Sequence, residues 1–162
     1  MKWSQWLEEW GMSGLKIKLY FLEMEFKPND VDRDAAWEMY VELLTRITTQ
    51  ALPAEHGDEQ TALESIYSLF NTTREVIKKH TRHCLEFTKI AVVVLNQIIR
   101  PFTAKWHKRS LAGAFKDQAQ CAEFRQELQQ LQARLKKYTA MLGSMAGVEE
   151  DLTLLEQVDE NN

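Results

Sequence analysis

Apolar residues recur at spacings of three and four over most of the chain after residue 30, which is the period of an amphipathic helix. The pattern predicts four helices, over residues 30–50, 59–81, 85–111 and 118–145. Polar segments separate them, the longest at residues 52–58. Asp117 is well placed to cap the fourth helix, since an aspartate before an apolar repeat is a typical helix start.

The fourth helix carries a heptad seam, in which apolar residues alternate at spacings of three and four over about 25 residues. Such a seam is typical either of the straightest helix of a bundle or of a coiled-coil contact with another chain. Within one domain of this length we favour the bundle. The seam consists of Cys121, Phe124, Leu128, Leu131, Leu135, Tyr138, Leu142 and Met145.

The segment before Pro28 follows a different period. Apolar and polar residues alternate from Leu15 to Phe21 and, after a change of phase, from Leu22 to Phe26. A period of two predicts one or two short strands, with a bulge where the phase changes. The alternative is an extended arm that packs on the helices or on another subunit.

Three tryptophans, Trp3, Trp6 and Trp10, lie at spacings of three and four near the N-terminus. A short helix would place all three indoles on one side. Since tryptophan is enriched at protein interfaces, they are candidates for binding a partner. The alternative is that they dock on the core of the domain itself.

The third predicted helix contains the most apolar stretch of the chain, Ile90–Ile99, which is apolar almost all round and indicates the central element of a bundle. Ten residues are too few to cross a bilayer, which takes about 20. Pro101 lies inside this helix and predicts a kink or break at residues 96–100. The first nine residues lack the pattern of a secretory signal, so we expect a cytoplasmic protein without a membrane partner.

Together these elements predict an all-α protein, a four- to five-helix up-and-down bundle with a short extended or β-like N-terminal arm. Residues 1–29 would form the arm, packed on the bundle, and residues 30–148 the bundle. Residues 149–162 would form an acidic tail with a short docked helix through Leu152 and Leu155.

The charge is distributed unevenly. Residues 74–116 carry ten Lys or Arg against two Glu, whereas the net charge of the whole chain is −4. This region predicts a surface for an acidic partner or a nucleic acid, unless the acidic residues of segments 30–42 and 55–64 neutralise it. The residues that would form it are Arg74, Lys78, Lys79, Arg82, Lys105, Lys108 and Arg109.

Two cysteines in apolar helical contexts, Cys84 and Cys121, indicate reduced core thiols more than a disulfide. His80, His83 and Cys84 lie close together in sequence, with His107 as a further contributor, and zinc would accept such ligands. However, no second Cys or His pair completes a site, and the setting is basic. We therefore expect no metal and no cofactor.

Arg100 and His107 are seven residues apart, about two helical turns, so both side chains can project to one side of the third helix. This spacing resembles the Arg-x4-6-His motif of the HEPN family, small helical bundles many of which are dimeric, metal-independent ribonucleases. The resemblance implies that His107 acts as acid or base on a ribose hydroxyl while Arg100 stabilises charge on the phosphate. Arg74 and His80 fit the same spacing, and Pro101 stands where the family commonly has a polar residue.

The leading hypothesis is a non-enzymatic helical adaptor or regulatory subunit that binds another protein or a second copy of itself. Residues 32–44 and 94–107 resemble uncharacterised bacterial helical proteins, so a bacterial stress or phage-defence system is the setting in which we would look for it. The alternative hypothesis is the HEPN-like ribonuclease or toxin, which leaves open whether the protein is an enzyme.

Overall fold

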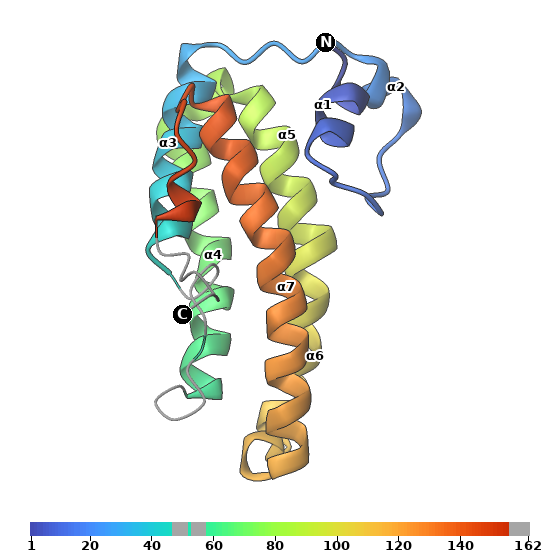
Figure 1. Ribbon diagram of the computed structural model, residues 1–162, viewed down its shortest axis with the longest axis vertical. Coiled ribbons are helices and arrows are strands. Elements are labelled where there is room, and N and C mark those ends of the chain that lie inside the picture. Colours follow the sequence, from blue (N-terminus) through green and yellow to red (C-terminus); the bar gives the residue numbers. More distant parts are fainter. Residues whose placement is uncertain (47–51, 53–57, 156–162) are drawn as a thin grey trace, which may run out of the picture.

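A computed structural model describes residues 1–46, 52 and 58–155. The described helices after the arm form an up-and-down bundle of four antiparallel rods (Figure 1). α5 and α6 count as one rod, because the π-helical turn η2 joins them without a break. The expected all-α bundle is therefore confirmed. Its elements are α3 (Asp30–Leu44), α4 (Glu59–His80), α5 (Leu85–Val94), η2 (Leu95–Ile99), α6 (Arg100–Leu111) and α7 (Gln118–Met145).

The helix boundaries follow their capping residues. Asp58 accepts a hydrogen bond from the amide of Thr61 at the start of α4, and Asp117 accepts one from Ala119 at the start of α7, as its sequence position predicts. The first helix ends at Leu44, earlier than the expected residue 50, and residues 47–51 lie outside the described part.

Pro101 does not break the third rod. The Arg100 amide donates to the carbonyl of Leu95, five residues earlier. The helical turn at η2 therefore contains one residue more than an α-helical turn, and the rod stays helical through it. A proline has no amide hydrogen and its ring crowds the preceding turn, and a wider turn accommodates both.

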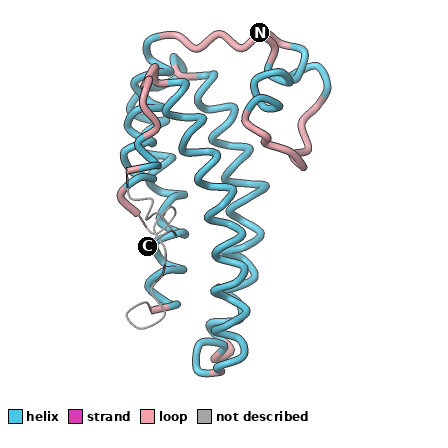
Figure 2. Tube along the Cα trace, in the orientation of Figure 1, coloured by secondary structure: helices cyan, strands magenta, loops and turns pink. Residues whose placement is uncertain are grey.

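The N-terminal arm is helical where strands were expected, so the strand prediction is wrong for the described residues (Figure 2). The arm contains α1 (Trp3–Glu9) and α2 (Leu19–Glu23), and its one ladder-like contact is an isolated bridge between Lys2 and Glu25. The alternative of an extended arm packed on the helices fits residues 15–18, where Leu15 and Ile17 are partly buried against the core.

The heptad seam lies inside the bundle. Phe124, Leu128 and Leu135 are completely or almost completely buried, so the seam is an intramolecular contact and not a coiled coil to another chain. Near its end, α3 and α7 run side by side (Figure 1). A Cβ at Gly143 would lie 3.0 Å from the Tyr40 ring, so glycine permits this close approach.

The tail after α7 folds back along α3. It contains the short 3-10 helix η4 (Leu152–Leu154), and the amide of Leu152 donates to the Tyr40 hydroxyl at 2.9 Å. The expected docked helix through Leu152 is therefore present in short form, whereas Leu155 is exposed. Residues 156–162 lie outside the described part.

Candidate functional site

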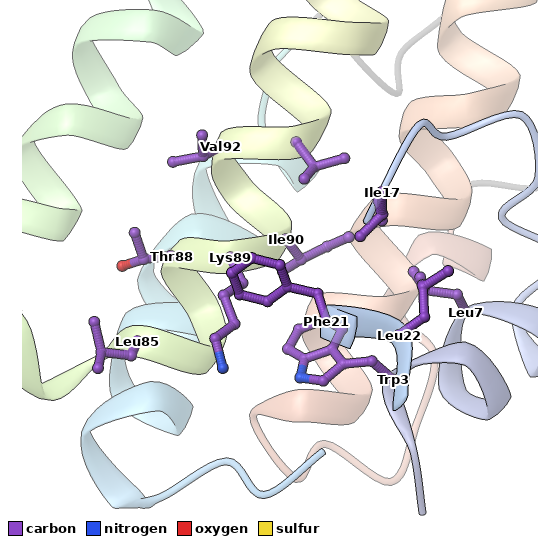
Figure 3. Close-up of a pocket in the computed structure, with 11 residues that line it drawn as sticks. Trp3, Leu7, Ile17, Phe21, Leu22, Leu85, Thr88, Lys89, Ile90 and Val92 are labelled. Carbon is purple, nitrogen blue, oxygen red and sulfur yellow. The ribbon is translucent and has the colours of Figure 1, made fainter. Parts of the chain in front are cut away.

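A groove lined almost entirely by apolar side chains lies between the N-terminal arm and α5. Its volume is about 330 Å³. Leu85 and Val92 project from α5, and Ile17, Phe21 and Leu22 face them from the arm (Figure 3).

The groove is open because α5 has an uncovered apolar face. Leu85 is 58% exposed and Val92 is 42% exposed, although both are large apolar residues. The expectation that Ile90–Ile99 forms an enclosed central helix is therefore wrong at Val92. The sequence held no signal for the groove, because a helix that is apolar all round is normally buried, and its pattern does not tell which face stays uncovered.

Glu86 fixes the wall of the groove. Its carboxylate accepts a hydrogen bond from the indole Nε1 of Trp3 at 2.9 Å and one from the Lys89 ammonium at 2.6 Å. The Lys89 nitrogen also lies 5.9 Å from the Trp3 ring centroid, within the range of a cation–π contact. The charge of Lys89 is thus compensated by its own fold, and the groove itself stays apolar.

The N-terminal tryptophans are part of this wall or support it, since Trp3 lines the groove and Trp6 does not. Trp3 and Trp6 are 5% and 3% exposed, and Trp6 stacks on Phe26 with ring centroids 4.2 Å apart. Trp10 is partly buried against the same core. Of the two alternatives for these residues, docking on the domain is the one observed for Trp3 and Trp6, and Trp3 also lines the groove.

Polar contacts hold the arm to the bundle along its length. The side-chain amide of Gln97, in η2, accepts from the Lys16 amide at 2.7 Å and donates to the Lys16 carbonyl at 2.9 Å. From α7, Arg134 donates to the carbonyl of Ser13 and Lys137 to that of Gly11. These contacts keep the arm in place as the second wall of the groove.

A second groove, of about 370 Å³, lies between α4 and α6. Arg100 and His107 both line it, so the expectation that they project to one side of the rod is confirmed. The Arg100 guanidinium donates to Asn96 Oδ1 at 3.2 Å and lies 4.7 Å from the Phe70 ring centroid. The opposite wall, on α4, contributes Gln60, Glu64 and Tyr67.

The seven predicted basic residues do not form one surface. Because α4 and α5–α6 are antiparallel, Arg74, Lys78, Lys79 and Arg82 lie near one end of the bundle and Lys105, Lys108 and Arg109 near the other. At 1.5 Å per residue, Leu85 and Lys105 are roughly 30 Å apart along the rod.

Several of these cations are neutralised inside the fold. Lys79 pairs with Glu38 at 2.6 Å, as expected for the acidic segment 30–42. Arg109 pairs with Glu123 at 3.0 Å, and Lys105 pairs with Glu123 and Glu127, which belong to α7 and not to the segments expected to supply the acids. Within the described ranges, no ion pair is formed by Arg74, Lys78, Arg82 or Lys108.

The described histidines do not gather around a metal position. His80 Nε2 lies 3.0 Å from Glu38 Oε1. Burial raises the pKa of the Glu38 carboxyl, but hydrogen bonds from Lys79 and His80 lower it, and the net pKa is below its ordinary value. His107 lies at the far end of the long rod from Cys84, so it cannot join that cluster. In the part of the chain that the structure describes, no three His, Cys, Asp or Glu side chains are arranged to hold a metal ion.

Both cysteines are free thiols. Cys84 is completely buried and its sulfur donates to the carbonyl of Thr81. Burial raises the pKa of the Cys121 thiol, and Glu59 raises it further, so the thiolate is disfavoured at neutral pH. Neither group has the setting of a catalytic nucleophile.

Among the described helices, none combines the length and the apolar content that crossing a membrane requires. Comparison of this chain with family models, curated proteins and solved structures finds no match.

Proposed function

We propose that this protein is a non-enzymatic helical adaptor or regulatory subunit, and that it binds another protein through the groove between the arm and α5. The observation that carries the proposal is the open apolar face of α5, where Leu85 and Val92 remain exposed beside the arm. Exposed apolar grooves with a rigid wall are the usual docking sites for partner segments. The arm gives the groove this rigidity through the Trp3–Glu86 hydrogen bond.

Val92→Glu tests this proposal, with Val41→Glu as its matched control. Both valines are helical and similarly exposed, at 42% and 39%, but Val41 is in the last turn of α3, outside the groove. A tagged protein recovered from its native cells should retain a stoichiometric, nuclease-resistant protein partner. Val92→Glu should lose it, because a carboxylate in the apolar groove must be desolvated on binding, whereas Val41→Glu should keep it.

A partner that stays bound to both variants would contradict the proposed surface. Recovery of nucleic acid in place of a protein would contradict the adaptor function itself. Circular dichroism and thermal unfolding of both variants establish that the fold is unchanged.

The second candidate is a HEPN-like, metal-independent ribonuclease. The observation in its favour is that Arg100 and His107 share one groove with Glu64 and Tyr67, so an RNA phosphate could meet both side chains. An imidazole in this position supplies general acid or base catalysis, typically worth 10²–10⁴-fold.

For this candidate, His107→Ala should lower the rate of RNA cleavage by at least about 100-fold. Cleavage by the wild type should persist in EDTA, because the mechanism needs no metal. His83→Ala is the control, because His83 is also an exposed histidine but lies in η1 (Thr81–His83), outside the groove. Equal cleavage by both variants, or none by the wild type, would exclude this function for the groove.

A further inference from the structure

The groove between α4 and α6 presents different chemistry along its length. The Arg100 guanidinium on α6 lies 4.7 Å from the ring centroid of Phe70 on α4. Because the two helices are antiparallel, His107, two turns further along α6, lies toward the end of the groove that Glu64 lines. Tyr67 lines the stretch between. The groove therefore has a cation at one end, an aromatic ring in the middle and a carboxylate at the other end.

Arg100 is held in place with hydrogen-bond donors to spare. Its Nε and Nη2 both donate to Asn96 Oδ1, at 3.3 and 3.2 Å, and its planar group lies over the Phe70 ring. The side chain is exposed, and among the described residues no carboxylate pairs with it and its Nη1 has no hydrogen-bond partner. A guanidinium fixed in this way is preorganised for a phosphate, whose oxygens it binds through parallel hydrogen bonds.

The charges around the groove favour an anion at the Arg100 end. The cations of α6 that face α7 pair with glutamates of α7, but Arg100 faces α4. Arg74 lies one turn beyond Phe70 on the same face of α4, and Lys108 follows His107; both are exposed. Glu64 is the one acidic side chain among the described residues that line the groove, and it lies at the opposite end from Arg100. A phosphate is therefore attracted to the end where Arg100 and Arg74 lie.

Tyr67 is a large aromatic side chain left open to solvent. It is 63% exposed, and its ring centroid lies 5.7 Å from that of Phe70, which is buried. An open aromatic ring beside a cation suits a nucleotide, because the base stacks on the ring while the phosphate meets the charge. Phe70 supports both parts, since it contacts the Tyr67 ring and the Arg100 guanidinium.

Glu64, one turn before Tyr67 on the same face of α4, has acceptor capacity to spare. Its Oε1 accepts from the Gln60 side chain at 3.2 Å, and within the described ranges it forms no ion pair. A carboxylate can accept further hydrogen bonds through both oxygens. Guanine presents two adjacent donors, N1–H and the N2 amino group, that match a carboxylate. Adenine presents an acceptor at N1, which a carboxylate repels.

We infer that this groove binds a guanine nucleotide, whose base stacks on Tyr67, whose N1 and N2 donors meet Glu64, and whose phosphate meets Arg100. The levels of Glu64 and Phe70 are about 9 Å apart along α4, the scale of one nucleotide from base to phosphate. A volume of about 370 Å³ is ordinary for a small-ligand site. The nucleotide is either free or part of single-stranded RNA. Binding requires no cleavage, so the inference goes beyond both functions proposed above.

Titration of the whole protein with GMP, IMP and AMP, followed by NMR chemical shifts, tests the choice of base. IMP differs from GMP in lacking the N2 amino group. We expect GMP to bind at least about tenfold more tightly than AMP, with IMP between them. Glu64→Gln should remove this preference, whereas Glu75→Gln, at an exposed glutamate of α4 outside the groove, should keep it. Equal affinity of the wild type for GMP and AMP would overturn the inference.

The ring and the cation are tested in the same way. Tyr67→Ala should weaken GMP binding roughly tenfold, whereas Tyr20→Ala, at a ring of α2 that is 60% exposed, should have no effect. Arg100→Gln should weaken GMP roughly three- to tenfold, less as salt is added, and should leave binding of guanosine, which has no phosphate, unchanged. Arg82→Gln, at an exposed arginine outside the groove, is its control. Equal effects of a variant and its control, or no binding of GMP or RNA at millimolar concentration, would overturn the inference.

A 2′-O-methyl oligouridylate with one central guanine, and its counterpart with a central adenine, distinguish the two sources of the nucleotide. Tighter binding of the guanine oligonucleotide than of GMP would support the inference with RNA as the source, and equal or weaker binding would support it with the free nucleotide. RNA cleavage that depends on His107 but shows no preference for guanine would overturn the inference and leave the nuclease in place. The test of the adaptor through Val92→Glu concerns another groove and is independent of these results.

Discussion

Asp32 joins the starts of two helices that are far apart in sequence. Its side chain accepts from the Asn29 amide at the start of α3 and, through its other oxygen, from the Phe87 amide in the first turn of α5, at 3.0 Å. Cys84, the residue at the N-cap of α5, makes no capping hydrogen bond of its own, so Asp32 supplies the cap from another helix. Asp32 is only 1% exposed, which makes water a poor substitute for it.

Asp32→Asn should destabilise the protein by about 2 kcal/mol. An asparagine side chain has one acceptor oxygen in place of two, so one of the two backbone amides would stay buried without a hydrogen bond. Asp30→Asn is the control, since Asp30 is also acidic and lies in the first turn of α3 but is exposed. It should cost no more than about 0.5 kcal/mol, the usual worth of an exposed charge at a helix end. Urea denaturation measures both, and equal losses would show that Asp32 is not a shared cap.

Among the elements, η2 performs two tasks within five residues. It accommodates Pro101 in the long rod, and it carries Gln97, whose amide bonds both backbone groups of Lys16 as a neighbouring strand would. The arm is thus fixed to the rod at the place where the rod departs from α-helical geometry. Gln97 therefore bonds the extended part of the arm directly to the rod.

Gln97→Leu should release this part of the arm without unfolding the bundle. Loss of two exposed hydrogen bonds costs about 1 kcal/mol, so exchange of the Lys16 amide with deuterated solvent should accelerate roughly fivefold. Asn96→Leu, which removes a side-chain contact to Arg100 only, should leave this exchange unchanged. Unchanged exchange in Gln97→Leu would show that the arm is held elsewhere.

The helices could be predicted from the sequence because each has a long apolar repeat and a polar cap. The third helix was expected at residues 85–111, and the long rod has these limits. The arm could not be predicted in the same way, because five residues from Leu19 to Glu23 are too few for a helical repeat, and their alternation fitted a strand equally well. Its conformation depends on tertiary contacts such as Gln97 to Lys16.

The candidate site was only partly predictable. Arg100 and His107 were identified from their spacing on one helix, which fixes their relative direction whatever the bundle does. The apolar groove was missed, because whether Val92 is covered depends on where the arm docks, and the pattern of α5 alone does not contain that information. For Trp3 and Trp6, docking on the core was one of two alternatives, and the structure shows it. Their spacing alone could not decide between docking and partner binding.

At the scale of the whole molecule, the arm and the bundle share one hydrophobic core. Trp3, Trp6 and Leu7 of α1 belong to the same buried cluster as the seam of α7. The arm is therefore part of the folded unit and not an appendage. A binding event in the groove, which lies between the two, would stabilise both of them.

Trp6→Ala should destabilise the whole protein by about 3 kcal/mol, the typical cost of truncating a large buried aromatic side chain. Trp37→Ala is the control, because Trp37 lies on α3 and is 45% exposed, and its loss should cost less than about 1 kcal/mol. Thermal unfolding followed by circular dichroism compares them. A local loss of the arm in Trp6→Ala, with the bundle transition unchanged, would mean that the two parts unfold separately.

The contact between Tyr40 and Gly143 has a consequence for synthesis of the chain. These residues belong to the first and last rods of the bundle, and about a hundred residues separate them. At 5–20 residues per second, the ribosome needs roughly 5 to 20 seconds to make that interval. Through that time the inner face of α3 has only part of its final cover, so the nascent chain presents Tyr40 and Leu43 to chaperones before α7 emerges to enclose them.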